Sequence, residues 1–179
     1  MTDRMVSLAM TIVIGLSARG WSADAPRALE AKARFQDAND APVGEAMLRE
    51  APNGVVLQAR FADLPPGVHG FHVHRTGKCE PPFTSAGDHF NPTGATHGFA
   101  AAKGPHAGDL PNIDVPESGD LTVELFVPGV TLASGKPGSL LDQDGSALVV
   151  HAGPDDHATD PSGKSGDRIA CAVIERPRE

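Results

Sequence analysis

The sequence is poor in aromatic residues: of its 179 residues none is tyrosine, one is tryptophan and seven are phenylalanine. A core must therefore be built mainly from valine, leucine, isoleucine, alanine and those phenylalanines. No apolar run reaches the roughly 18 residues that a membrane-spanning helix requires. The net charge of −8, with the acidic residues dispersed along the chain, disfavours binding to a nucleic-acid backbone. The length favours one domain with a substantial core.

The N-terminus carries a shorter apolar run, "MVSLAMTIVIGL", which follows Arg4 and leads into "ADA" at residues 23–25. The "ADA" fits the small-x-small rule for signal peptidase, so residues 1–25 are predicted to be a secretory signal and residues 26–179 the mature domain. The alternative is a first strand or a buried helix of the domain. Export would bring the only two cysteines, Cys79 and Cys171, into an oxidising compartment where they could pair.

Beyond residue 25 the pattern predicts an all-β fold. Alternating or β-branched stretches occur at residues 28–35, 54–64, 121–127, 146–152 and 168–175, separated by turn signals such as "PNG", "LPPG" and "SGKPG". Many short strands of this kind are typical of an antiparallel sandwich or barrel. Residues 76–109 and 152–167 are long polar loops without period. Loops of this length are usually functional or disordered, and their histidines favour function.

Two histidines stand close together in "GFHVH". On a strand, His72 and His74 point to one face while Phe71 and Val73 point to the other. Two imidazoles on one rigid face suit a shared metal ion, although the same pattern also occurs on an ordinary polar face.

The first long loop adds His89, His97 and His106, with Asp109 three residues after the last. Three imidazoles and one carboxylate suit a closed tetrahedral zinc site, which would also order a loop with little apolar material. The alternative is a solvated loop with incidental histidines. His151 is a further imidazole at the end of an apolar strand pattern.

These stretches together resemble the copper/zinc superoxide dismutases. "GFHVH", "GKCEPPFTSAGDHFNP", "HGF", "HAGDLPNI", "VVHAGPDD" and "GDRIACAVI" occur in the family's order and at compatible spacing, from residue 28 to residue 175. The resemblance implies a Greek-key antiparallel β-barrel or sandwich of about eight strands with two long functional loops. It also implies copper and zinc as cofactors and superoxide anion as the substrate.

Residue by residue, the resemblance implies two metal sites. Copper would be bound by His72, His74, His89 and His151, and zinc by His89, His97, His106 and Asp109. The imidazolate of His89 would bridge the two metals.

Further roles follow from the same resemblance. Asp155 would hydrogen-bond one ligand of each metal and fix the ring orientations. Arg168 would attract the anion, His89 would also deliver a proton to the product, and Cys79 and Cys171 would form an intramolecular disulfide.

The implied reaction is the disproportionation of superoxide to O2 and hydrogen peroxide, as protection against extracytoplasmic superoxide. Copper-chaperone and binding modules with this fold lack part of the copper set, and a metal-storage protein would need no Arg168. All four copper positions and Arg168 are present here, which favours an enzyme. An alternative for Arg168 is an ion pair with Asp167 or Asp160. The bacterial-looking "DPSGKSGDRIACAVI" favours a periplasmic location, and the sequence leaves open whether the protein is a monomer or a homodimer.

Four other residues carry smaller expectations. His69 is expected to hydrogen-bond within the core and His157 to be solvated. Asp88 adds a carboxylate beside His89, and Lys164 could add long-range attraction for an anion.

Overall fold

The computed structural model describes residues 28–177, and the predicted signal at residues 1–25 lies outside them. Within the described part of the chain no helix is long and apolar enough to cross a membrane. The strands are β1 (Glu30–Asp37), β2 (Pro42–Ala51), β3 (Gly54–Phe61), β4 (Gly67–His69), β5 (Phe71–His74), β6 (Ile113–Val115), β7 (Leu121–Pro128), β8 (Ala147–His151) and β9 (Arg168–Val173), with one 3-10 turn, η1 (Thr84–Ala86). The all-β prediction is confirmed.

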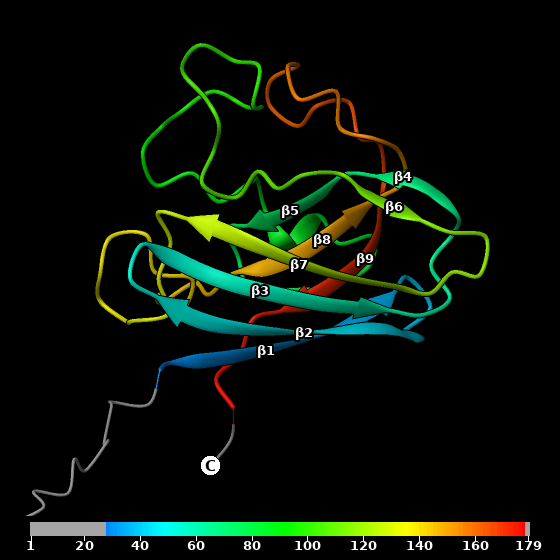
Figure 1. Cartoon of the computed structure of the whole chain (residues 1–179), viewed down its shortest axis with the longest axis horizontal. Helices are drawn as coiled ribbons and strands as arrows, with labels where there is room; N and C mark the ends of the chain where they lie inside the picture. The colour runs from blue at the N-terminus through cyan, green and yellow to red at the C-terminus, as the bar shows by residue number, and fades with distance from the viewer. Residues whose placement is uncertain (1–27, 178–179) are drawn as a thin grey trace, which may run out of the picture.

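The main sheet has seven strands in the order β5-β8-β9-β1-β2-β3-β7, and β4 pairs with β6 in a small second sheet. Each pairing is antiparallel. β9 pairs with β1 and β7 with β3, so strands distant in sequence are neighbours, and the connections from β3 to β5 and from β7 to β8 cross from one end of the sheet to the other, as in a Greek key. The sheet curls strongly about its core (Figure 1).

All five predicted strand regions contain strands, and the stretch considered as a strand around His72 and His74 forms two, β4 and β5, but the pattern missed β2 and β6. β2 has the sequence PVGEAMLREA, which is rich in residues that are depleted in strands. Its side chains still alternate, with Val43, Ala46 and Leu48 buried. β2 forms because it pairs along its length with both β1 and β3, a tertiary contact that overrides its weak propensity.

The core is built from aliphatic side chains and four phenylalanines, Phe35, Phe61, Phe71 and Phe90, as the composition predicts. The ring centroid of Phe35 lies 4.8 Å from that of Phe61 and 6.1 Å from that of Phe71, and Phe61 and Phe71 are 5.8 Å apart. These rings join β1, β3 and β5, so the strand that carries His72 and His74 is fixed directly to the main core.

β5 and β8 are buried on both faces. Phe71 and Val73 of β5, with Leu148 and Val150 of β8, pack into the main core. The opposite face of β8 packs in a second cluster of Phe83, Ala86, Ala147, Val149 and Cys171. The first loop, residues 76–109, and the second loop, residues 152–167, stand together at one side of the sheet, at the top in Figure 1 (green and orange). The polar face of β5 is therefore enclosed between sheet and loops.

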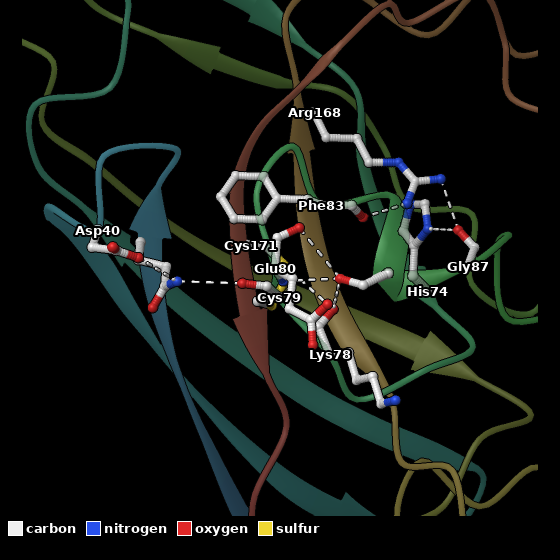
Figure 2. The surroundings of a disulfide bond; sticks show 11 residues. Asp40, His74, Lys78, Cys79, Glu80, Phe83, Gly87, Arg168 and Cys171 are labelled. Carbon is white, nitrogen blue, oxygen red and sulfur yellow. Dashed lines mark hydrogen bonds between the residues drawn. A yellow bond between two sulfur atoms is a disulfide. The ribbon is translucent and has the colours of Figure 1, made fainter.

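The expected disulfide is present between Cys79 and Cys171, whose Cα atoms are 5.6 Å apart. It joins the start of the first loop to β9, and Gln36 of β1 donates a side-chain hydrogen bond to the carbonyl of Cys79. The first loop is thus tied to the sheet at its N-terminal end (Figure 2).

Candidate metal centre

The free edge of β5 positions the first loop. Backbone bridges place His89 opposite His74, and Asp109 opposite His72. The N–H of Val73 donates to the carbonyl of Gly108, and the N–H of Phe90 donates to the carbonyl of Val73, each at 2.8 Å. Residues from both ends of the loop are therefore held against one short strand, which brings their side chains to His72 and His74.

The structure brings the predicted residues into two groups whose candidate ligand atoms lie within 4.8 Å of one another. The first cluster contains His72, His74, His89 and His151, and the second cluster contains His89, His97, His106 and Asp109. All seven side chains are buried, and His89 belongs to both clusters. His151 reaches the first cluster from β8, where the pairing with β9 shifts register between Val150 and His151.

Each ring of the first cluster has one nitrogen held by a protein oxygen: His72 Nε2 by Asp155 Oδ2 (2.7 Å), His74 Nδ1 by Gly87 O (2.8 Å), His89 Nδ1 by Asp109 Oδ1 (2.8 Å) and His151 Nδ1 by Gly166 O (3.1 Å). The other nitrogen of each ring is buried and has no hydrogen-bond partner among the described residues. Because the carbonyls of Gly87 and Gly166 can only accept, His74 and His151 must carry their hydrogen on Nδ1 and present a lone pair at Nε2. The first cluster therefore groups four buried ring nitrogens whose lone pairs could bind a metal ion.

The second cluster converges on one carboxylate oxygen. Oδ1 of Asp109 lies 2.8 Å from Nδ1 of His89, 3.1 Å from Nδ1 of His97 and 3.2 Å from Nδ1 of His106. Its Oδ2 accepts the backbone N–H groups of Gly98 and His106, at 2.8 and 2.9 Å, and these bonds fix the carboxylate.

Asp155 connects the two clusters. Its Oδ2 accepts from His72 Nε2, and its Oδ1 lies 3.0 Å from His97 Nε2. If His97 donates through Nε2, its neutral ring turns a lone pair at Nδ1 toward Asp109. A lone pair facing a carboxylate at 3.1 Å is repulsive unless a cation lies between them. This geometry fits a bound metal ion.

Burial keeps the four imidazoles of the first cluster neutral. It lowers the pKa of His72 to about 4 and that of His151 to about 3, and it also lowers the pKa values of His74 and His89. Burial opposes ionisation of Asp109, but hydrogen bonds from His89 and from the N–H of Gly98 hold the pKa of this carboxyl below its usual value. Neutral imidazoles beside an ionised carboxylate are the protonation states that metal binding requires.

Arg168 lies at the edge of the first cluster. Its Nη1 donates to the carbonyl of Phe83 at 2.6 Å, and its Nη2 donates to the carbonyl of Gly87 at 2.7 Å. The same Gly87 carbonyl accepts from His74, so the guanidinium and the His74 ring lie side by side (Figure 2). In residues 28–177 Arg168 makes no ion pair with Asp167 or Asp160, which were its alternative partners.

The remaining expectations have mixed outcomes. His69 is buried, with ring nitrogens 2.7 Å from the carbonyl of His151 and 2.8 Å from that of Pro65, so its predicted core hydrogen bonding is confirmed. His157 was expected to be solvated, but only 30% of its side chain is exposed and its ring contacts Asn112. Asp88 and Lys164 are exposed, and each pairs with an oppositely charged neighbour, Arg75 and Asp156 respectively.

The sequence did not predict the oxygen atoms that hydrogen-bond the candidate metal-binding residues and orient them. The carbonyls of Gly87 and Gly166 orient His74 and His151, and the side chain of Asn112 holds the backbone of Asp155. Backbone carbonyls leave no signal in side-chain spacing. The asparagine in "DLPNI" stands close to Asp109 in sequence and was visible only as part of the family-like motif.

The two clusters adjoin each other on an all-β scaffold and share the imidazole of His89, an arrangement that defines a binuclear metalloprotein. Four imidazoles suit copper, and three imidazoles with a carboxylate suit zinc. Residues 43–174 match the family model described as copper/zinc superoxide dismutase. The chain belongs to this family, which binds copper and zinc, and it is an enzyme of superoxide dismutation.

Several bacterial proteins are similar over most of the chain. Copper-zinc superoxide dismutase 2 of Aquifex aeolicus is 44% identical over 155 residues, 86% of this chain and 91% of that protein. The copper-zinc superoxide dismutase of Caulobacter vibrioides is 40% identical over 174 residues, 95% and 99% of the two chains. A superoxide-dismutase-like protein from Bacillus subtilis, solved as a double mutant, aligns with a TM-score of 0.77 at 39% identity, covering 79% of this chain and 95% of the other. These relatives and the disulfide are consistent with an exported protein.

The lowered histidine pKa values predict an acid-labile metal-free protein. Below about pH 6.5 the unfolded chain takes up protons that folded His72, with its pKa of about 4, still excludes. Such a histidine therefore lowers the free energy of unfolding as pH falls from about 6.5 toward 4, by up to about 1.4 kcal/mol per pH unit. Urea unfolding of the metal-free protein at pH 7, 5.5 and 4.5 measures the slope. His72→Phe should make the dependence of the unfolding free energy on pH shallower, whereas equal stability of the wild type at pH 7, 5.5 and 4.5 would contradict the assignment.

Proposed function

We propose that this protein removes superoxide outside the cytoplasm, in the periplasm or the extracellular space. In this proposal copper is bound by His72, His74, His89 and His151, and zinc by His89, His97, His106 and Asp109. The observation that carries the proposal is that each of the four copper histidines has one buried ring nitrogen without a hydrogen-bond partner in the described chain. Leaving a buried polar atom unpaired costs about 1–3 kcal/mol, so four in one place are best explained by a ligand.

The bound copper would supply one-electron redox chemistry, and the bound zinc a fixed charge without redox chemistry. His89, the one histidine that belongs to both donor sets, would help to hold both metals as an imidazolate; its Nδ1 lies beside Asp109, and its Nε2 is a buried nitrogen without a hydrogen-bond partner in the described chain. In the first half of the reaction one superoxide would give up its electron and leave as O2, and Nε2 of His89 would take a proton. In the second half another superoxide would receive that electron together with this proton and one from solvent. Two superoxide anions and two protons then give O2 and hydrogen peroxide.

Arg168 would attract and orient the anion. Two carbonyl oxygens hold its guanidinium but neutralise none of its charge. Burial lowers its pKa and Asp88 opposes that shift, and a guanidinium remains charged at any working pH. The same group repels a second positive charge on His74, which helps to keep that ring neutral.

Two histidine variants test the ligand assignment. His151→Ala removes a donor that only the copper set uses, so it should lose copper and dismutase activity while zinc stays bound. His106→Ala removes a donor that only the zinc set uses, so it should lose zinc while copper stays bound. Metal analysis after dialysis and a superoxide-disappearance assay on metal-loaded and metal-free protein measure both effects.

Loss of the same metal from both variants would contradict the two-site assignment. A wild-type protein that binds both metals but does not accelerate superoxide disappearance would instead support the alternative function, a copper- and zinc-binding or copper-chaperone module.

Arg168→Ala tests steering. The variant should keep both metals, lose on the order of tenfold in second-order rate and show a flatter salt dependence, because local charge focusing fades as ionic strength rises. Arg49→Ala, on β2, removes the same net charge from another part of the sheet and is the matched control. A wild-type rate and salt slope in Arg168→Ala would exclude this residue from anion capture.

Export through a cleaved signal is the second part of the proposal. The only tryptophan, Trp21, lies within residues 1–25, and the chain has no tyrosine, so a mature protein starting at residue 26 contains neither. N-terminal sequencing of the exported protein should begin at residue 26, and its fluorescence should lack tryptophan emission. Tryptophan emission from the exported protein would refute this cleavage site. Sedimentation of the same sample would decide between monomer and homodimer.

A further inference from the structure

We propose that His157 is a positioning residue that locks Asp155 and the second loop against the first loop. This inference rests on the proposed function, because Asp155 acts through His72 and His97. No metal-binding role falls to His157, whose ring lies outside both clusters.

Asn112 fixes the tautomer of His157. The side-chain oxygen of Asn112 accepts the backbone N–H of Asp155 at 2.9 Å, so its amide nitrogen is the group that faces the carbonyl of Asp155 (2.9 Å) and Nε2 of His157 (3.2 Å). An amide nitrogen only donates, and therefore Nε2 of His157 must accept. The ring hydrogen then sits on Nδ1, which is buried and lies 3.6 Å from Oδ1 of Asp155.

His157 also supports Asp155 through its backbone. Its N–H donates to Oδ1 of Asp155 at 2.6 Å, the oxygen that also faces Nε2 of His97. This bond requires the backbone of His157 to turn, and its φ is 55°, in the left-handed region. Histidine tolerates that region better than most residues with a side chain.

The first loop closes over the same residue. The N–H of Ala100 donates to the carbonyl of His157 at 2.9 Å, and the ring of Phe99 lies 5.1 Å from the His157 ring, centroid to centroid. A Cβ added at Gly98 would collide with the His157 carbonyl, so the two loops touch backbone to backbone there. Gly98 in turn donates its N–H to Asp109.

His157 therefore contacts Asp155 directly and lies against Gly98, whose N–H donates to Asp109. Its ring nitrogen, its ring face, its N–H and its carbonyl each engage a different partner. A residue used in this way sets the distance between the loops, and through Asp155 the orientation of His72 and His97. Outer hydrogen-bond partners of metal-binding imidazoles commonly control metal affinity.

The first measurement reads the tautomer itself. Long-range 1H–15N spectra of the imidazoles, recorded on protein purified with its own metals and with the copper reduced, should show His157 protonated at Nδ1 and bare at Nε2. Protonation at Nε2 would overturn the proposal, because Asn112 could then not donate to the ring. This signal does not depend on activity.

The second measurement is the rate of zinc loss to a chelator. His157→Phe keeps an aromatic ring against Phe99 but removes both nitrogens, and it should lose zinc about tenfold faster than wild type. Cobalt placed in the zinc site should show a changed visible spectrum in this variant. His157→Gln, whose side-chain oxygen can again accept from Asn112, should recover part of the effect.

Lys164→Ala is the matched control, because Lys164 lies in the same loop at φ 54° and outside this network. Equal zinc loss in wild type and His157→Phe would overturn the proposal, as would the same acceleration in Lys164→Ala, which would assign the effect to backbone strain. A wild-type protein that holds zinc with the predicted tautomer but lacks dismutase activity would refute the proposed function and leave this inference standing. If the wild type held no metal, the tautomer measurement alone would decide it.

Discussion

The carboxylate of Asp155 is the interaction on which the candidate metal centre depends, because it joins His72, which belongs only to the first cluster, to His97, which belongs only to the second. Its side chain is fully buried, and an isolated buried carboxylate is strongly unfavourable. Hydrogen bonds from His72, His97 and the N–H of His157 compensate that cost and hold its pKa below the usual value despite burial. Asp155 lies in the second loop and not in a strand, so contacts with neighbouring residues must specify the path of the loop's backbone. At Gly163, for example, φ is +63° and any Cβ would collide with the carboxylate.

The same centre works against stability. Four unpaired imidazole nitrogens are buried where water cannot satisfy them, and each is a cost that apolar packing would avoid. The rest of the fold offsets it. The packed rings of Phe35, Phe61 and Phe71 anchor β5, and the disulfide links residues separated by 92 positions, for which chain-entropy estimates give roughly 4–5 kcal/mol. Metal bound only by the folded chain would add to this balance. Core packing and the disulfide, both away from the site, thus offset the cost of keeping unpaired imidazole nitrogens buried within it.

The charge near the first cluster is opposite in sign to the net charge of the chain. The chain carries a net charge of −8, which repels an anionic substrate at long range. Arg168 keeps a local positive charge at the first cluster because carbonyl dipoles, rather than a carboxylate, hold its guanidinium. The carbonyls that do so belong to Phe83 and Gly87, in the segment that the disulfide ties to β9 (Figure 2). The disulfide therefore also fixes the segment whose carbonyls position the Arg168 guanidinium.

Local periodicity in the sequence was enough to predict most of the long strands and the shared face of His72 and His74. The three histidines and the aspartate of the first loop were enough to predict a zinc site there. Periodicity failed at β2, whose composition resembles a loop and whose pairing on both sides makes it a strand. His157 was predicted to be solvated because it lies in the second loop without a ligand role in the family resemblance, but this loop folds back so that the His157 ring contacts Asn112 and Phe99. The contacts that orient the site join residues far apart in the chain: 83 positions separate His72 from Asp155, and 85 separate Arg168 from Phe83. Side-chain alternation relates residues only a few positions apart. The sequence by itself therefore determined which histidines and which arginine are available. Only the curled sheet with its two closed loops decided which oxygen each ring nitrogen or guanidinium faces, because those partners are distant in the chain.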